Sequence, residues 1–176
     1  MSSPAPAGYR QLDEDRYRET VGLSYDELRE GLVIEHRPGR TVTETDNVLM
    51  STLGGNDAPI HTDTQYSGLT QWCRPLVCGT ITLHIVGGMT VRSISGLTTA
   101  SLGFEEIRFT HPVFTGDPLY AQTEITGRRL SRSRPDTGIV TCRTTGHNQH
   151  GTPVVTFTRS FFLPTEATAV RDRTTY

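Results

Sequence analysis

The sequence predicts an α+β protein in which a long buried helix packs on one face of an antiparallel sheet. Two observations lead to this prediction. Residues 74–96, RPLVCGTITLHIVGGMTVRSISG, form the longest apolar stretch of the chain. Its length and small residues favour a buried helix over a strand. The second half of the chain holds four short runs rich in β-branched and aromatic residues. Turn sequences separate these runs, as is typical of antiparallel strands.

Length and charge exclude several classes of protein. The 176 residues suit one domain with room for an extension. With a net charge of −2, nothing in the composition indicates binding to nucleic acid or to a membrane. The polar start lacks the apolar segment of a signal peptide, and no run is long enough to span a bilayer. We therefore expect a soluble, cytoplasmic protein.

Cysteine, histidine and lysine usage limits the chemistry further. Cys73, Cys78 and Cys142 lack the paired spacing of a disulfide framework or a zinc site. The histidines likewise match no metal-site spacing. All 17 basic residues are arginines, which excludes Schiff-base chemistry on a lysine. The sequence thus predicts neither a metal nor an organic cofactor.

The first elements follow from local signals. Residues 1–24 are expected to form an extension that is disordered at its start, because this start is rich in Ser, Ala and Pro. Ser24 and Glu27 have the spacing of a capping box, which predicts a short helix ended by the next glycine. Residues 32–43 then read as a strand with a break at its Pro-Gly pair.

Two further helices are expected on either side of an unusual loop. Thr43 resembles an N-cap, with acidic residues in the following turn, so a helix with a short apolar face should run to Gly54. Asp63 should cap another short helix that ends near Leu69. Between them, residues 54–63 read GGNDAPIHTD. This loop places a histidine among an amide and two carboxylates.

The remaining chain is predicted to be a β-meander. Apolar and polar residues alternate most clearly in VVTFTRSFF, which indicates a strand with one buried face. The intervening sequences are rich in Gly, Pro, Asp and Asn, as turns require. The four expected strands lie within residues 100–113, 117–131, 138–149 and 152–164.

Several motifs, in this order, resemble those of the MaoC-like dehydratases, the single-hot-dog (R)-specific enoyl-thioester hydratases. GRTVTETDNVLMSTLGGNDAPIHTDTQYS is similar to the hydratase motif of that family, and RPLVCGTITLHIV to the start of its central helix. GFEEIRFTHPVFTGDPLYAQTEI resembles its first meander strands. The last strands are similar to the branch that includes mesaconyl-type CoA hydratases. The resemblance covers residues 25–164 and leaves 165–176 as a tail.

This resemblance implies a hot-dog fold, in which a long central helix is wrapped by a curved antiparallel sheet. It also implies a homodimer joined edge to edge, with the active site at the interface. The function implied is the reversible interconversion of 2-enoyl and 3-hydroxyacyl thioesters, carried on CoA or on an acyl carrier protein.

The resemblance also assigns the proton-transfer residues. His61 matches the catalytic histidine of the family, and Asn56 takes the place of its catalytic aspartate. An amide can orient a water or an imidazole, but it cannot take a proton at ordinary pH. Three interpretations stay open: His61 transfers the protons while Asn56 places the water, Asp57 acts as the base, or the chain has lost hydratase activity.

Other matched positions suggest how the thioester is held. Gly79 corresponds to the glycine at the start of the central helix, where free N–H groups would stabilise an enolate oxygen; close packing would also explain it. Cys78, where relatives often have histidine, is expected to be a small residue beside the substrate. Arg132 and Arg134 are predicted to contact CoA phosphates or a carrier protein, with a solvated hairpin as the alternative.

Two other functions compete with hydration. A hot-dog thioesterase typically uses a carboxylate on or near the central helix, and CGTITLHIVGGMT contains none. A non-catalytic subunit that binds thioesters or pairs with an active chain is permitted by Asn56. The sequence does not name the acyl group.

Overall fold

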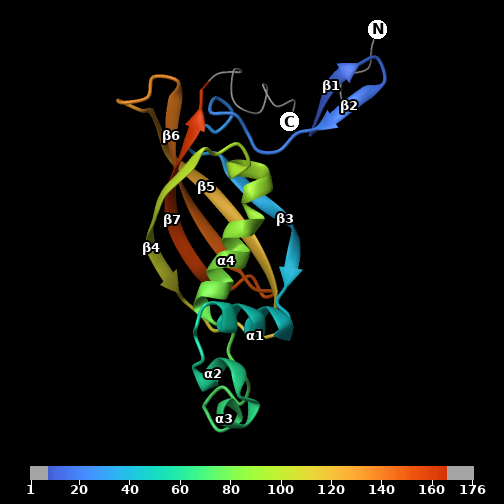
Figure 1. The fold of residues 1–176 in the computed structure, drawn as a ribbon, viewed down its shortest axis with the longest axis vertical. Coiled ribbons are helices and arrows are strands. Elements are labelled where there is room, and N and C mark those ends of the chain that lie inside the picture. Colours follow the sequence, from blue (N-terminus) through green and yellow to red (C-terminus); the bar gives the residue numbers. More distant parts are fainter. Residues whose placement is uncertain (1–7, 166–176) are drawn as a thin grey trace.

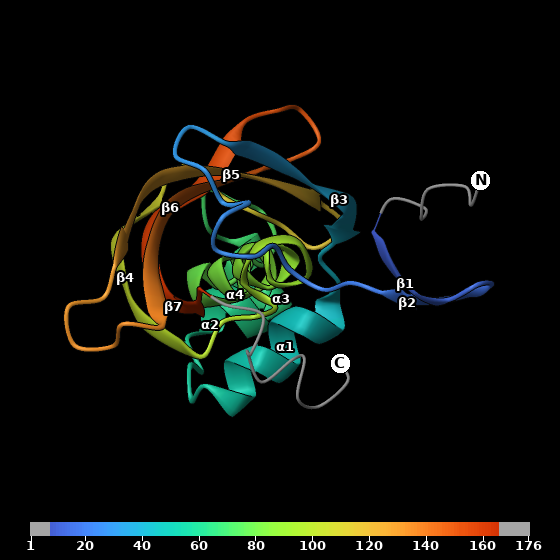
Figure 2. The same ribbon diagram turned by 90° about the horizontal axis from the view of Figure 1, so that it is seen from above.

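The computed structural model describes residues 8–165, in which a curved sheet wraps around one helix. Figures 1 and 2 show α4 (Gly79–Met89) lying in the concave face of the sheet. The α+β hot-dog architecture predicted from the sequence is thereby confirmed. The disorder predicted at the start of the chain, and all but the first residue of the predicted tail, lie outside the described residues. The predicted domain boundaries stay predictions.

The sheet has five strands and is antiparallel throughout. Its spatial order is β3-β5-β6-β7-β4. The strands are β3 (Val33–Thr41), β4 (Ala100–Phe109), β5 (Pro118–Leu130), β6 (Thr137–His147) and β7 (Pro153–Pro164).

The predicted strands all form, but they do not make a simple meander. β4 pairs with β7 instead of with β5, so the chain crosses to the far side of the sheet between β4 and β5. The ring of Phe104 on β4 packs against that of Phe157 on β7, with centroids 5.4 Å apart. Turn sequences mark where strands end but do not show which strands pair, and this is why the prediction was wrong.

Three short helices lie between β3 and α4: α1 (Glu44–Leu53), α2 (Pro59–Thr62) and α3 (Thr64–Gly68). The predicted N-caps are confirmed. Thr43 and Asp46 form a reciprocal capping box at the start of α1, and the Asp63 carboxylate accepts two backbone N–H groups at the start of α3. The predicted apolar face of α1 is wrong, because its buried residues are Asn47 and Ser51.

The first thirty residues depart from prediction in two places. The Glu27 carboxylate accepts hydrogen bonds from the Ser24 backbone and hydroxyl at 2.8 and 2.7 Å, yet the segment after it forms turns, not a helix. One capping pair cannot offset the cost of nucleating so short a helix. In the extension, β1 (Tyr9–Asp13) and β2 (Arg16–Glu19) form an unpredicted hairpin.

The core lies between α4 and the sheet and contains two apolar clusters. One is centred on α4 and includes Ile81, Val86 and Phe157; the other includes Ile94 and Phe161. Ile94 belongs to η1 (Val91–Ser95), a π-helical turn that continues α4. Helix and sheet approach closely, since a Cβ added at Gly146 of β6 would lie 2.6 Å from the Val86 side chain.

A polar layer separates the two clusters. On β5, Thr123 lies between the inward-facing Ala121 and Ile125, and on β7, Arg159 lies between Phe157 and Phe161. Both polar residues are buried. The interior is therefore divided along the length of α4, with polar side chains near its C-terminal end.

One edge of the sheet is open. β4 pairs with β7 along one side only, and all ten of its residues are exposed. Four of them are large and apolar, with 40–51% of their surface exposed. These are Leu102, Phe104, Ile107 and Phe109. No helix among residues 8–165 is both long and apolar enough to cross a bilayer.

Candidate active site

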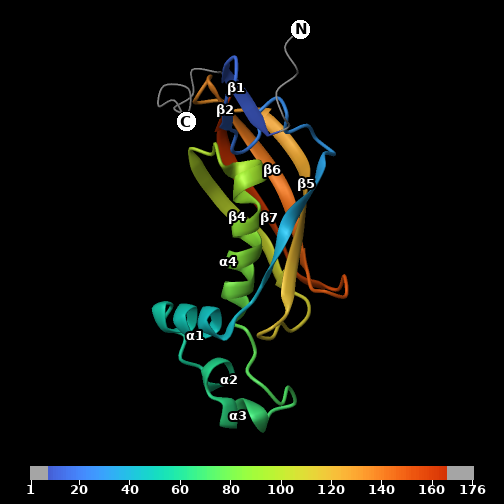
Figure 3. The same cartoon turned by 90° about the vertical axis from the view of Figure 1, so that its right-hand side faces the viewer.

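The residues predicted to carry out proton transfer gather at the N-terminal end of α4. Figures 1 and 3 show α1, α2 and α3 grouped below this end. His61 belongs to α2, Asn56 to the loop before it, and Cys78 is the N-cap of α4. Gly79 follows Cys78 as the first residue of α4, so the fold brings together four of the predicted site residues.

Asn47, which the sequence analysis missed, ties this group together. It projects from α1 with 1% of its surface exposed. Its Nδ2 donates to the carbonyl oxygens of His61 and Leu76 at 2.8 and 3.0 Å, and its Oδ1 accepts from the Cys78 N–H at 3.1 Å. One amide therefore fixes the backbone under His61 to the start of α4. No short sequence pattern indicates this role, because the two carbonyl groups lie 14 and 29 residues away in the chain.

The imidazole of His61 has a defined orientation. Its Nδ1 lies 3.0 Å from the Leu76 carbonyl oxygen, which also accepts from Asn47. Because a carbonyl oxygen only accepts, Nδ1 carries the proton in the neutral ring. Nε2 is then left with a free lone pair. A half-buried histidine in this tautomer can take a proton from a water or a substrate.

Asn56 is held in place by Cys78. Its Nδ2 donates to the Cys78 Sγ at 3.1 Å, and its Oδ1 accepts from the Ala58 N–H at 3.3 Å. The remaining Nδ2 hydrogen and Oδ1 lone pair are available to a water molecule. An amide fixed in this way can orient a water without exchanging a proton with it.

Cys78 is buried and polarised. Burial acts to raise the pKa of its thiol, but hydrogen bonds from Thr80, Asn56 and the backbone of Ile81 outweigh burial and hold the pKa below its ordinary value. The Sγ lies 3.1 Å from the Thr80 Oγ1. The Asn56 amide is thus one of the donors that stabilise the charged form of this sulfur.

Gly79 is the first residue of α4 and meets β4 closely. A Cβ at this position would lie 3.1–3.2 Å from the ring of Phe109, so close packing explains the glycine. Within residues 8–165 its N–H has no acceptor, and no side chain caps the helix. An N–H at the positive end of an 11-residue helix can donate to an oxyanion. The two interpretations of Gly79 are compatible.

The other predicted site residues have no hydrogen bond or ion pair to this group in the described structure. Asp57 is exposed, and its carboxylate has no partner in the described part of the chain. Arg132 and Arg134 follow β5, which ends at the opposite end of the sheet from α2, the helix that contains His61 (Figures 1 and 3). The Arg134 guanidinium lies over the Phe162 ring, 4.7 Å from its centroid.

A groove of about 590 Å³ lies beside α4 on the β3 side and is distinct from the His61 group. Its walls include the Arg40–Asp46 ion pair, His84 and Met89. Neither His61 nor Asn56 lines it. In the described part of the chain, no cluster of three or more His, Cys, Asp or Glu side chains could hold a metal ion.

Similarity to known proteins agrees with the fold and the motifs. The chain is 30% identical to a mesaconyl-CoA hydratase of Cereibacter sphaeroides, over 79% of this chain and 40% of that protein. It is 31% identical to an (R)-specific enoyl-CoA hydratase of Aeromonas caviae, over 56% of this chain and 69% of that one. A solved Mycobacterium tuberculosis protein described as having a double hotdog fold superimposes with a TM-score of 0.75 at 25% identity, covering 84% of this chain and 46% of that one.

The extent of these matches differs between relatives. The chain spans less than half the length of the mesaconyl-CoA hydratase and of the double-hotdog protein. One part of the double-hotdog protein, 46% of its length, therefore corresponds to 84% of this chain. Residues 28–148 match the family described as the MaoC like domain, and this segment contains His61, Asn56, Cys78 and Gly79. The chain belongs to the MaoC-like dehydratase family.

Proposed function

We propose that the protein catalyses the reversible addition of water to a 2-enoyl-CoA thioester, giving the 3-hydroxyacyl-CoA. The observation that carries this proposal is the His61 ring, whose Nδ1 is hydrogen-bonded to the Leu76 carbonyl while Nε2 has no partner among residues 8–165. Two relatives support it, because their names are mesaconyl-CoA hydratase and (R)-specific enoyl-CoA hydratase.

In the proposed reaction, His61 serves as both base and acid. Asn56 orients a water, whose oxygen attacks C3 of the enoyl group while His61 Nε2 takes its proton. The negative charge that develops on the thioester oxygen is stabilised by the Gly79 N–H. His61 then delivers the proton to C2, so that one water has been added across the double bond. Dehydration follows the same steps in reverse.

The proposal is tested by following the loss of enoyl absorbance with crotonyl-CoA and mesaconyl-CoA. Replacing His61 with Ala should lower kcat by about 10²–10⁴-fold, the usual contribution of a general acid-base group. His84→Gln, an exposed histidine on α4, is the matched control and should keep wild-type activity. If the folded protein leaves a broad enoyl-CoA panel untouched, hydration is the wrong reaction, and release of free thiol would indicate a thioesterase.

Asn56 provides a second test, which separates an enzyme from a partner subunit. In an active hydratase that uses Asn56 to place water, Asn56→Leu lowers kcat, since leucine cannot hydrogen-bond to water. If the wild type is inactive and Asn56→Asp creates activity, the chain is a non-catalytic member of a pair.

We further propose that two copies associate through their β4 edges. The inward-facing Phe104 and Phe109 remain exposed on this edge, and unpaired edges are an aggregation risk that proteins usually cover. A second copy would extend the sheet and supply the second hot-dog unit that the double-hotdog relative carries in one chain.

Sedimentation of the purified protein should show a dimer, and Phe104→Lys should shift it to monomers. A stable monomer, or a dimer that needs a different chain, would contradict this arrangement. Location in the cytoplasm stays a prediction.

A further inference from the structure

An arginine between α3 and α4 is held in place by an aromatic ring. The guanidinium carbon of Arg74 lies 3.7 Å from the centroid of the Phe114 ring, so the cation rests on the face of that ring. The ring of Trp72 packs against the same phenylalanine, with centroids 6.2 Å apart. Because this stacking restricts the long side chain, Arg74 loses little conformational freedom when it binds a ligand.

The ring that supports Arg74 belongs to the end of the molecule that contains His61. Phe114 follows β4, and its backbone forms a β-bridge with Leu76. Its N–H donates to the Asp117 carboxylate at 3.0 Å. The carbonyl oxygen of Leu76 is the one that lies 3.0 Å from His61 Nδ1. Backbone contacts therefore attach the stacked arginine to the segment that orients His61.

The hydrogen-bond donors of Arg74 are unused by the protein. Its side chain is exposed, and its guanidinium has no hydrogen bond or ion pair among residues 8–165. Arg40, which precedes α1, differs because Asp46 binds it at 2.5 Å. Contact through the face of the guanidinium leaves the N–H groups at its edge free, and these suit the oxygens of a phosphate group.

We propose that Arg74 binds a phosphate group of the substrate, at the end of the pantetheine arm that lies away from the thioester. The inference rests on the proposed function, which places the thioester at His61 and the Gly79 N–H. It moves the predicted phosphate contact from Arg132 and Arg134, which follow β5, to the end of the sheet that contains His61. CoA and the prosthetic group of an acyl carrier protein both carry such a phosphate.

The spacing along the chain suits the length of this arm. Two peptide units separate Arg74 from Leu76, so their Cα atoms lie at most about 7.6 Å apart. The extended arginine side chain adds a comparable length between its Cα atom and the guanidinium group. A thioester beside His61 is therefore within one pantetheine arm of Arg74.

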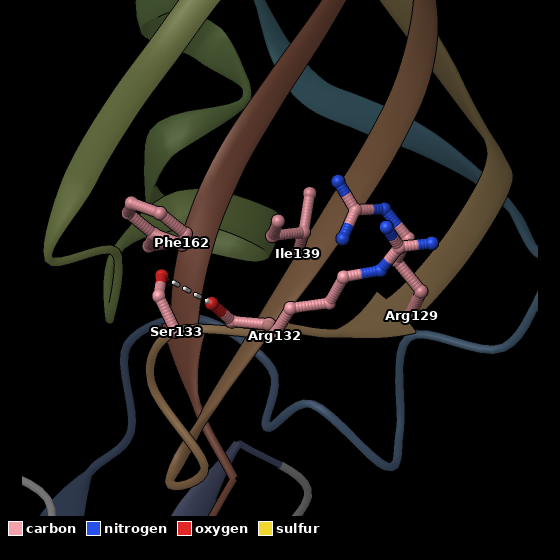
Figure 4. A pocket seen from close by; sticks show the side chains of 6 residues that line it. Arg129, Arg132, Ser133, Ile139 and Phe162 are labelled. Carbon is pink, nitrogen blue, oxygen red and sulfur yellow. Dashed lines mark hydrogen bonds between the residues drawn. The ribbon is translucent and has the colours of Figure 1, made fainter.

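A second group of arginines lies on the wrong face of the sheet for this role. A pocket of about 410 Å³ contains Arg129 and Arg132 and is lined by Phe162 (Figure 4). Along β7, Phe162 follows the buried Phe161, which packs with Ile94 in the core. Successive residues of a strand point to opposite faces, so this pocket lies on the outer face, turned away from α4. Arg129 therefore provides a matched control for the loss of one arginine.

Kinetics with and without the phosphate test the site. For Arg74→Gln, we expect KM for crotonyl-CoA to rise by about tenfold, because the loss of one charged hydrogen bond weakens binding by that order. KM for crotonyl-pantetheine, which has no phosphate, should change less than twofold, and kcat should stay unchanged for both substrates. Arg129→Gln should leave both KM values unaltered. Equal changes for the two substrates in Arg74→Gln, or none, would overturn the proposal.

Binding without turnover separates failure of this site from failure of the proposed function. Trp72 is the only tryptophan of the chain and packs against Phe114, so its fluorescence should respond to a ligand at Arg74. Titration with CoA, checked by calorimetry, should give a Kd about tenfold higher for Arg74→Gln than for the wild type. If the wild type binds CoA in this way but hydrates no enoyl-CoA, the phosphate site stands and hydration fails. A wild type that does not bind CoA, or a Kd that the change leaves unaltered, contradicts the site.

A substrate with a single phosphate identifies which group Arg74 holds. Crotonyl-4′-phosphopantetheine carries only the phosphate that CoA and carrier proteins share. If Arg74→Gln raises KM for this compound, Arg74 binds the shared phosphate. If KM rises for crotonyl-CoA alone, Arg74 binds a phosphate of the nucleotide, and the substrate is a CoA thioester. Both results uphold the proposal, and a KM that rises for neither compound contradicts it.

Discussion

The two ends of α4 use buried polar side chains in opposite ways. At the N-terminal end, Asn47 fixes the backbone but leaves the His61 Nε2 and the Gly79 N–H without partners in the described structure. At the C-terminal end, polar side chains bond to one another. His36 contacts Ser93 and Thr123 at 2.7 and 2.8 Å. The N-terminal end thus keeps an unpaired acceptor and an unpaired donor for a ligand, whereas at the C-terminal end the polar side chains pair with one another.

Arg159 pairs with polar side chains at the C-terminal end of α4. With 8% of its surface exposed, it donates from Nη2 to the Thr90 Oγ1 at 2.6 Å and the Ser95 Oγ at 3.2 Å. A cation here faces the negative end of the α4 dipole. Its buried Nε has no hydrogen-bond partner in the described structure. We conclude that changes at this end should alter stability, whereas changes at the other end should alter catalysis.

The largest expected effect on folding comes from Arg159→Ala. It removes a buried side chain, two hydrogen bonds and a charge at the helix terminus, so the free energy of unfolding should fall by about 3 kcal/mol. Urea denaturation measures this change. Arg143→Ala, an exposed arginine on β6, should cost less than about 0.5 kcal/mol. A large loss of kcat in folded Arg159→Ala would contradict the division between the two ends.

At the other end, Asn47→Leu should affect the reaction most. It preserves side-chain volume but releases the carbonyl groups under His61, and misplacing a catalytic group by about 1 Å can cost about 10²-fold in rate. We expect kcat for crotonyl-CoA to fall by about that factor. Ser51→Ala is the matched control, since Ser51 is the other buried polar residue of α1 and its hydroxyl has no partner in the structure. If Ser51→Ala lowers kcat as much, helix packing explains both effects.

His36 should make stability depend on pH. Burial, followed by the charges of Arg159 and Arg37, lowers its pKa from 6.5 to about 4. The unfolded chain therefore binds a proton more readily than the folded one, so stability falls as pH decreases from 6.5 towards 4 and the loss is complete below 4. The slope approaches about 1.4 kcal/mol per pH unit.

Urea denaturation at several pH values checks this dependence. The difference between wild type and His36→Gln should flatten above pH 6.5 and change below it. His150→Gln, which replaces an exposed histidine, should leave the curve unaltered. A wild-type curve parallel to that of His36→Gln down to pH 4 would show that His36 does not titrate as inferred.

Much of this architecture could be predicted, because local signals specify local structure. Thr43 and Asp63 cap the helices predicted for them, since capping depends on a few adjacent residues. The pairing of β4 with β7 and the buried face of α1 depend on residues distant in sequence. Asn47 illustrates this, because its acceptors lie 14 and 29 residues away and no short pattern contains them.

The smallest expected effect concerns Asp57, the alternative base. Its carboxylate is exposed and has no hydrogen-bond or ion-pair partner in the described chain, whereas Asn56 is oriented by Cys78. A group without positioning contacts supplies little acid-base catalysis, so Asp57→Asn should change kcat/KM for crotonyl-CoA less than threefold. Asn56→Leu, one residue away, should lower it much more. A 100-fold loss in Asp57→Asn would instead mean that the loop rearranges on binding substrate and that Asp57, not Asn56, faces the water. The site would then use two proton-transfer groups, His61 and Asp57. Asn56 would only support the part of the loop that moves.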